Sequence, residues 1–315
     1  MNIKHFITRR TALKRLLQVS GTVAVSAFNG WPFNSLDSVW AKSEKRGFIV
    51  EGLGKKEGYS VKELTRKVFE AAGGITRFIS RGDVVAIKPN ISFPSRPELA
   101  ATTNPEVLEA VIELCYEAGA KKVRIADNTI NDPTQCFAFT GAGMVAKKTN
   151  ADLVYPRSSL MKRMKINGHR LDVWPVFIPF VEADKVINLP VAKTHSVSCL
   201  TLGMKNWMGA IDGNRWSLHQ DINQSIVDLA QFFKPTLTLI DAIRIMIKNG
   251  PSGGSLSDLA IKNTLILSND QVAADAKASI LFNWDPECLW FIHLGQKWGL
   301  GTYDFQKLDQ KKVIL

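Results

Sequence analysis

The stretch KTHSVSCLTLGMKNWMGAIDG, from Lys193 to Gly213, combines residues that could do chemistry with residues typical of a protein core. Lys193 and Lys205 can each bind a phosphate or a carboxylate as a point charge. His195 has a side chain whose ordinary pKa of about 6.5 suits it to proton transfer. We therefore predict that His195 and Lys205 are catalytic and that Lys193 and Asn206 bind a ligand.

Other polar side chains directly follow predicted strands. Lys88 and Asn90 come after the β-branched run Asp83–Ile87, and Asp241 comes after the apolar run Thr236–Ile240. In α/β proteins, ligands bind outside the carboxyl ends of parallel strands. We therefore predict that Lys88 and Asn90 bind a ligand and that Asp241 is catalytic. Contact with solvent would explain any one of these residues alone.

Two carboxylates are candidates for holding a metal ion. Asp241 follows the mostly apolar run Leu237–Ile240, so it is expected to start partly buried, and a buried carboxylate needs a lysine, a metal ion or a proton. Asp241 and Asp275 would orient a lysine or hold a hard divalent cation such as Mg²⁺. The five histidines of the chain show no spacing typical of zinc ligands.

The segment Gly250-Pro251-Ser252-Gly253-Gly254 is dense in glycine. Backbone amides in such a loop can approach an anion closely, so Gly253 and Gly254 are predicted to bind the ligand. A plain surface turn would explain the same residues. The loop does not match the spacing of nucleotide-binding glycine motifs, so nucleotide binding is not indicated. Trp207 is expected to line the same pocket.

The elements that must position these residues alternate between strand and helix. Strands are predicted at residues 48–51, 83–87, 123–126, 184–189, 236–240 and 263–267, and helices at residues 61–72, 104–118, 141–150, 221–233 and 271–282. This alternation predicts an α/β fold, with a mainly parallel sheet sandwiched by helices. Residues 165–180 are expected to form a small β flap.

The N-terminus resembles a twin-arginine export signal. Thr8–Lys14 contains the arginine pair, and the apolar run Leu16–Phe28 that follows is too short to span about 30 Å of hydrocarbon. Cleavage is predicted after Ala41, leaving residues 42–315 as one α/β domain with no stable transmembrane anchor. The expected partner is the twin-arginine export machinery, and the expected location is the periplasm. An uncleaved basic leader is the alternative.

Composition narrows the classes of function further. The chain has four cysteines but no C-x-x-C pair, which excludes the usual iron–sulfur and zinc-ribbon spacings; Cys115 and Cys288 are expected to be buried thiols. The net charge is +11, but beyond residue 42 the chain holds 34 basic and 28 acidic residues, or +6. Without a basic run, nucleic acid is not an expected partner. The excess is compatible with an anionic ligand.

Four segments together resemble the domain of unknown function 362 family. They are residues 83–90 (DVVAIKPN), 184–213 (DKVINLPVAKTHSVSCLTLGMKNWMGAIDG), 241–254 (DAIRIMIKNGPSGG) and 268–277 (SNDQVAADAK). The resemblance extends over about residues 47–301. Members often carry ferredoxin-like cysteine motifs or twin-arginine leaders; this chain has the leader alone, so no iron–sulfur cluster is expected within it. The family name brings no established activity.

Two hypotheses about function follow. The first is an exported enzyme-like protein that binds an anionic small molecule bearing phosphate or carboxylate, with or without a divalent metal. The alternative is a non-catalytic periplasmic binding or redox-accessory protein. An enzyme would need Asp241 or Asp275 to face His195 or Lys205, whereas a binder needs only the lysines. In a third, purely structural interpretation, the polar residues that follow the predicted strands serve only to cap helices.

Overall fold

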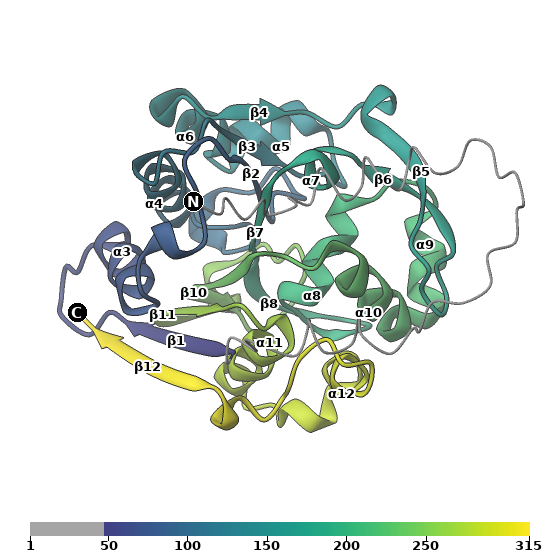
Figure 1. Ribbon diagram of the computed structural model, residues 1–315. Coiled ribbons are helices and arrows are strands. Elements are labelled where there is room, and N and C mark those ends of the chain that lie inside the picture. Colours follow the sequence, from purple (N-terminus) through teal and green to yellow (C-terminus); the bar gives the residue numbers. More distant parts are fainter. Residues whose placement is uncertain (1–46) are drawn as a thin grey trace, which may run out of the picture.

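The computed structural model describes residues 47–315, so the expected signal peptide and its cleavage site lie outside the described residues. A ten-stranded sheet runs through the molecule in the order β12-β1-β11-β10-β7-β2-β3-β4, with β8 and β9 attached beside β10 (Figure 1). The strands are β1 (Phe48–Leu53), β2 (Val84–Pro89), β3 (Lys122–Ala126), β4 (Asp152–Val154), β7 (Lys185–Leu189), β8 (Val191–His195), β9 (Cys199–Thr201), β10 (Leu237–Met246), β11 (Leu259–Ser268) and β12 (Asp309–Ile314).

Most neighbouring strands in this sheet are parallel. The run from β10 through β7, β2 and β3 to β4 is parallel throughout. The antiparallel pairs are β11 with its two neighbours, and β9 with β8. The predicted α/β class with a mainly parallel sheet is therefore confirmed.

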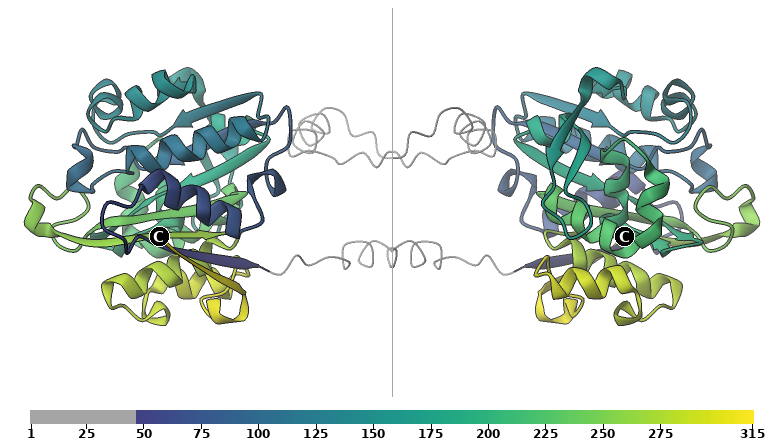
Figure 2. Two further views of the ribbon diagram at one scale, coloured as in Figure 1. Left: turned by 90° about the vertical axis from the view of Figure 1, so that its left-hand side faces the viewer. Right: turned by 90° about the vertical axis from the view of Figure 1, so that its right-hand side faces the viewer.

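Helices cover both faces of the sheet (Figures 1 and 2). One face carries α3 (Val61–Ala71), α4 (Pro105–Glu117), α5 (Pro133–Phe139) and α6 (Ala142–Thr149); the other carries α7 (Pro179–Glu182), α8 (Gly203–Asn206), α10 (Ile222–Phe233), α11 (Gln271–Ser279) and α12 (Trp290–Lys297). Alternate residues of a strand point to opposite faces. Accordingly Val85 and Ile87 of β2 pack in the first core and Ala86 packs in the second.

Local sequence signals explain where several of these helices begin. Asn104 accepts a hydrogen bond from the Glu106 amide at 2.9 Å and Pro105 occupies the first turn of α4, as the sequence predicts. Asp270 caps α11 in the same way, through the Ala273 amide at 2.9 Å. These caps fix where α4 and α11 begin.

The predicted flap is present as a separate two-stranded sheet. It pairs β5 (Met161–Lys165) with β6 (Val173–Phe177) in antiparallel register, so it begins four residues earlier than expected. A single bridge between Val176 and Ile211 joins it to the segment that follows α8.

One predicted strand end is corrected by the structure. The run that begins at Thr236 does not end at Asp241, because β10 continues to Met246. The physical reason is that Pro190 interrupts β7 but the chain resumes as β8. β8 then pairs with the second half of β10, starting at Asp241. Asp241 therefore lies inside a strand.

The four cysteines are free thiols. Cys115 and Cys136 are buried, whereas Cys199 and Cys288 are exposed. Cys288 thus differs from the expectation, since it lies in a surface turn before α12.

Within residues 47–315, no helix has both the length and the apolar character needed to cross a membrane.

Candidate functional site

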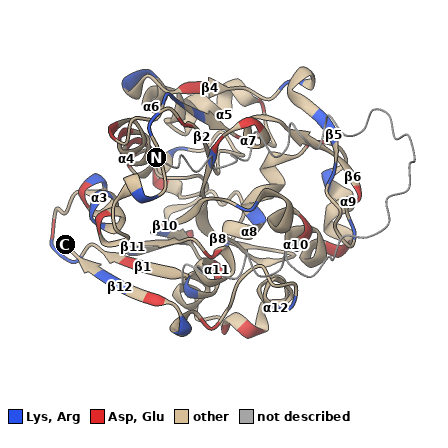
Figure 3. Cartoon of the chain, in the orientation of Figure 1, with Lys and Arg blue, Asp and Glu red and all other residues tan. Residues whose placement is uncertain are grey.

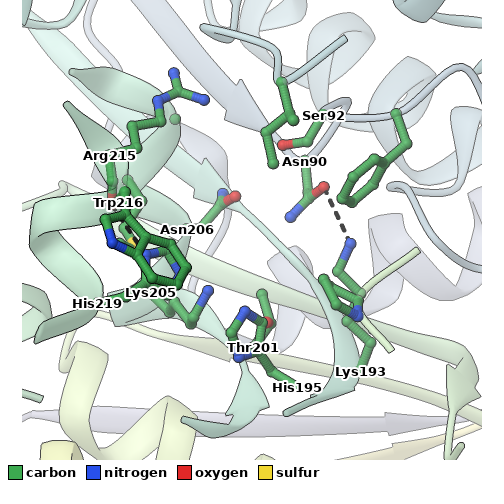
Figure 4. Close-up of a pocket in the computed structure, with 15 residues that line it drawn as sticks. Asn90, Ser92, Lys193, His195, Thr201, Lys205, Asn206, Arg215, Trp216 and His219 are labelled. Carbon is green, nitrogen blue, oxygen red and sulfur yellow. Dashed lines mark hydrogen bonds between the residues drawn. The ribbon is translucent and has the colours of Figure 1, made fainter. Parts of the chain in front are cut away.

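A pocket of about 260 Å³ opens where β2, β3 and β8 end (Figure 4). Its lining consists of Asn90, Ser92, Phe93, Ile130, Lys193, His195, Thr201, Lys205, Asn206, Met208, Gly209, Arg215, Trp216, His219 and Pro251. Two lysines, an arginine and two histidines are among these fifteen residues of the described chain, and no Asp or Glu is. Elsewhere acidic and basic residues are interspersed, for example along α3 (Figure 3). The pocket is therefore a positively charged, small-molecule-sized site at the expected edge of the sheet.

Lys193, near the end of β8, is held at one side of the pocket. It is 1 % exposed, and its ammonium donates hydrogen bonds to Asn90 Oδ1 at 3.4 Å and to the Ala101 carbonyl. The Phe93 ring lies 5.1 Å from the same nitrogen. Burial, together with the charge of Lys205, lowers the pKa of Lys193 to about 7. Lys193 is thus held in place by hydrogen bonds and has no carboxylate partner among the described residues.

Lys205 is buried without any such anchor. It lies on the short helix α8, is 8 % exposed, and its amine has no hydrogen-bond or ion-pair partner in the described part of the chain. Burial lowers the pKa of Lys205 to about 7. Thr201, on β9, shares this character, because its hydroxyl is buried and makes no hydrogen bond within residues 47–315. Both groups line the pocket with unused capacity to bind a ligand.

The hydrogen bonds of His195 assign its neutral tautomer. Its Nδ1 accepts from the Val197 amide at 3.1 Å and the Ser198 amide at 3.3 Å, so Nε2 carries the proton. Burial, and then the nearby charges of Lys205, His219 and Lys193, lower the pKa of His195 to about 3. His195 is therefore a neutral hydrogen-bond donor at neutral pH.

His219 has the opposite tautomer. Its Nδ1 lies 2.9 Å from the Arg215 carbonyl oxygen, which can only accept, so Nδ1 carries the proton of the neutral ring and Nε2 is free to accept one. The two histidine rings are stacked, with centroids 5.8 Å apart, and the Trp216 ring lies over His219 at 6.4 Å. The pocket thus offers one imidazole donor and one imidazole acceptor side by side (Figure 4).

Lys88, predicted to bind the ligand, is placed behind the pocket instead. Its ammonium is 2.6 Å from Asp127 Oδ1 and also donates to the Pro89 carbonyl at 2.9 Å and to Asn206 Oδ1 at 3.3 Å. The other carboxylate oxygen of Asp127 accepts from the Ile91 amide. The charge of Lys88 is fully used within the fold, which is why it is not available to a ligand.

The two carboxylates proposed for a metal ion are also outside the pocket lining. Asp241 accepts hydrogen bonds from the Asn104 and Ile243 amides, and Asp275 accepts from the first two amides of α8. Burial raises the pKa of Asp241 to about 6 and that of Asp275 to about 7. Backbone hydrogen bonds and partial protonation thus account for their burial. Among residues 47–315, no group of three or more His, Cys, Asp or Glu side chains could hold a metal ion.

The glycine-dense loop reaches the pocket through a different residue from those predicted. Pro251 is in the lining, whereas Gly253 and Gly254 are not. A Cβ on Gly253 would lie 2.3 Å from Met246 Cε, so this glycine allows close packing on β10. Gly254 has open space around its Cα. The loop therefore contributes an apolar wall in place of amides.

Of the predicted site residues, the structure brings five together. They are Asn90, Lys193, His195, Lys205 and Asn206. Sequence reasoning missed Arg215, Trp216 and His219, from α9 (Arg215–Leu218) and the turn after it. The signal available was the four-residue spacing of Arg215 and His219, which places both on one face of a helical segment. Trp207, expected in the pocket, is fully buried and stacks on Phe233 at 4.8 Å instead.

The chain is similar to several known proteins. The chain is similar to Thylakoid-associated protein sll1697 of Synechocystis sp., with 27 % identity over 252 residues that cover 78 % of this chain and 77 % of that protein. Among solved structures, it is similar to the lactate racemase apoprotein from Thermoanaerobacterium thermosaccharolyticum, with 13 % identity and a TM-score of 0.45. That match covers 75 % of this chain and 56 % of the racemase chain. A structure from Thermotoga maritima matches at 10 % identity and a TM-score of 0.43, covering 70 % of this chain and 59 % of that one.

A family model described as Domain of unknown function (DUF362) matches residues 85–279, which include every residue of the pocket lining. The match extends over more than half of the chain. The chain therefore belongs to the DUF362 family.

Proposed function

We propose that the pocket binds a small organic anion, bearing a carboxylate or a phosphate, and transfers a proton to or from it. The observation that carries this proposal is the composition of the lining, which has five basic side chains and no acidic one among the residues described. A concentration of positive charge in a partly enclosed cleft attracts anions, because low-dielectric walls focus the field. A bound carboxylate or phosphate beside Lys193 would also favour the protonated form of that lysine, since an opposite charge raises a lysine pKa.

The rest of the lining suits an organic anion better than a bare inorganic one. Phe93, Ile130, Met208 and Pro251 contribute apolar surface to the same lining. The unpaired hydroxyl of Thr201 offers an additional hydrogen bond. A ligand with a charged head and a short apolar or planar body would satisfy both halves of the pocket.

The two histidines supply the proton-transfer part of the proposal. His219 accepts a proton at Nε2, and the Arg215 carbonyl then stabilises the imidazolium through its hydrogen bond to Nδ1. His195 donates from Nε2 to an oxygen that gains negative charge as the proton leaves the substrate. This pairing corresponds to abstraction of a proton from a carbon next to a carbonyl or carboxylate. It replaces the role that sequence reasoning gave to Asp241 and Asp275, so a divalent metal ion forms no part of the proposal.

A binding and exchange experiment tests both parts. The melting temperature of the purified protein is measured with acetate, oxalate, pyruvate and inorganic phosphate, and exchange of pyruvate methyl protons with D₂O is followed by NMR. We expect at least one anion to raise the melting temperature, as any ligand selective for the native state does. His219→Gln should keep that shift and lose the exchange. Binding without exchange in the wild type would instead favour the non-catalytic binding protein, and no shift with any anion would contradict the proposal.

We further propose that the chain is exported by the twin-arginine machinery, with cleavage after Ala41. The support is the sequence of the first 41 residues, with its arginine pair and short apolar run. Changing both Arg9 and Arg10 to Lys should leave uncleaved precursor in the cytoplasm, whereas Arg15→Lys, outside the pair, should not. Equal amounts of processed periplasmic protein from both variants would rule out this route.

A further inference from the structure

We propose that the amine of Lys205 is a covalent nucleophile, which forms an imine with the carbonyl carbon of a small oxo acid bound in the pocket. This inference rests on the proposed anion binding for recognition of the acid group, and it adds a substrate class and a bond to the enzyme.

The backbone around Lys205 is anchored, whereas its amine has no hydrogen-bond partner among the described residues. Asp275 accepts hydrogen bonds from the amides of Gly203 and Met204 at 2.7 and 2.9 Å, which anchors the start of α8. The side chain of Asn206 donates to Asn188 Oδ1 at 2.8 Å and anchors its end. The Lys205 side chain leaves this clamped turn and reaches the pocket, where its amine has no partner within residues 47–315 (Figure 4).

The other two buried lysines near the pocket show what such a side chain does when it serves as a cation. Lys88 is paired with the Asp127 carboxylate, and Lys193 donates to the Asn90 and Ala101 oxygens. Both are therefore held by acceptors, and an ammonium that donates hydrogen bonds cannot attack a carbon. Burial lowers the pKa of both Lys193 and Lys205 to about 7, so the difference between them lies in their hydrogen bonds. Lys205 has no acceptor among the described residues, so its amine lone pair is free to attack when the amine is neutral.

The neighbouring groups suit each stage of imine formation. Lys193 holds the carboxylate of the oxo acid. The Lys205 nitrogen attacks the carbonyl carbon, forming a C–N bond while the C=O electron pair moves to oxygen and His195 Nε2–H donates a hydrogen bond to it. Proton transfer from nitrogen to this oxygen and loss of one water then give the imine. The step consumes no oxidant or reductant.

Imine formation also explains why a base lies beside this amine. A protonated imine withdraws electrons from the adjacent carbon, so a C–H bond there becomes more acidic. His219, with Nε2 free to accept, lines the same pocket as Lys205. Lysine and histidine would thus act on one substrate in sequence.

Reductive trapping tests the inference directly. The protein is incubated with pyruvate and cyanoborohydride, and intact mass and peptide mapping are measured. We expect one adduct per chain, heavier than the protein by the mass of pyruvic acid less one oxygen, located on Lys205. Lys205→Arg and Lys205→Met should both lose it, whereas Lys162→Arg, an exposed lysine outside the pocket, should retain it. Oxalate, which has no ketone, should compete with labelling.

The outcomes separate this inference from the proposed function. If oxalate or pyruvate raises the melting temperature but no adduct forms, or the adduct persists in folded Lys205 variants, imine formation is overturned while anion binding stands. If no anion raises the melting temperature and labelling is spread over surface lysines, both fail. A melting curve for each variant shows whether loss of labelling reflects loss of folding.

Discussion

Two neighbouring buried regions of this protein differ in whether their buried lysines have hydrogen-bond acceptors. The closed network consists of Lys88, Asp127, Asn188 and Asn206, and the open pocket has Lys205 and Lys193 in its lining. In the closed network the Lys88 ammonium has three acceptors within 3.3 Å, including a carboxylate. In the open pocket Lys205 has none among the described residues. Both lysines are more than nine-tenths buried, so burial alone does not mark a binding site; unused hydrogen-bonding capacity does.

Asn206 joins the two regions. Its amide nitrogen donates to the Lys88 carbonyl at 3.0 Å and to Asn188 Oδ1, and its oxygen accepts from the Lys88 ammonium. It also lines the pocket directly beside Lys205 in the chain. The closed network therefore positions the helix that carries the free amine. Disturbing the network should unfold the protein, whereas disturbing the pocket should change binding.

The largest effect is expected from Lys88→Met. This change leaves the Asp127 carboxylate buried without its partner, and breaking a buried ion pair on one side costs about 3–5 kcal/mol of the free energy of unfolding. Urea denaturation of the variant and the wild type measures the difference. The double change Lys88→Met with Asp127→Asn should recover part of the loss. A cost below about 1 kcal/mol would mean that the pair contributes little to the fold.

Gly209→Ala should cost less, about 1–3 kcal/mol, by crowding the same pair. A Cβ at this position would lie 2.1 Å from Asp127 Oδ1 and 2.7 Å from Lys88 Nζ, so both groups must move. Gly254→Ala is the matched control, because a Cβ there meets no atom within 4 Å. It should change stability by less than about 0.5 kcal/mol. Equal effects at the two glycines would contradict the close approach at Gly209.

The closed network also shows what sequence could predict and what it could not. Buried parallel strands have continuous apolar sequences. For that reason the run Asp83–Ile87 predicts the strand that carries Lys88, and the run Asp184–Leu189 predicts the strand paired with it. The partner of Lys88 was not evident. Asp127 lies 39 residues away, and nothing local in either segment tells which of several strand-end residues meet.

The open pocket was predictable in part for the same reason. Lys193 and His195 come shortly after a recognisable strand, so the rule for strand ends led to them. Arg215 and His219 lie in a short helix and turn without an apolar periodicity, and only tertiary packing brings them to the pocket. Asp241 was misjudged because strand β8, which begins after Pro190, extends the pairing of β10 in a way that no local pattern reveals.

Lys205→Met should separate binding from stability. Removing an unpartnered buried amine leaves no other polar group unsatisfied within the described residues, so the free energy of unfolding should stay within about 1 kcal/mol of the wild type or rise. The affinity for the small anion that stabilises the wild type should fall about tenfold, or about 1.4 kcal/mol. Titration calorimetry and urea denaturation measure the two quantities. A large loss of stability with unchanged affinity would place Lys205 in the structural network instead.

A further effect is expected in the pH dependence of the free energy of unfolding. The pKa of Lys205 is lowered to about 7 in the native protein from an ordinary value of 10.5, so between these values the unfolded chain binds more protons than the folded one. The free energy of unfolding contributed by Lys205 therefore rises with pH above about 7, by at most about 1.4 kcal/mol per pH unit for one proton. Lys193, with a similarly lowered pKa, contributes in the same direction.

Urea denaturation between pH 7.5 and 8.5 measures this slope. The window lies above the raised pKa values of Asp241 and Asp275 and below the ordinary thiol pKa of 9.0, where the unfolded chain would begin to lose the Cys115 and Cys136 protons that burial retains in the native protein. Lys205→Met should have a smaller slope than the wild type, because one of the lysines with a lowered native pKa is absent. Lys88→Met is unsuitable as a comparison, since it is expected to be too unstable. Lys162→Arg, at the surface, should reproduce the wild-type slope. Identical slopes in Lys205→Met and the wild type would mean that Lys205 stays protonated in the native pocket over this pH range. Lys205 and Lys88 would then differ in their hydrogen-bond acceptors but not in their charge.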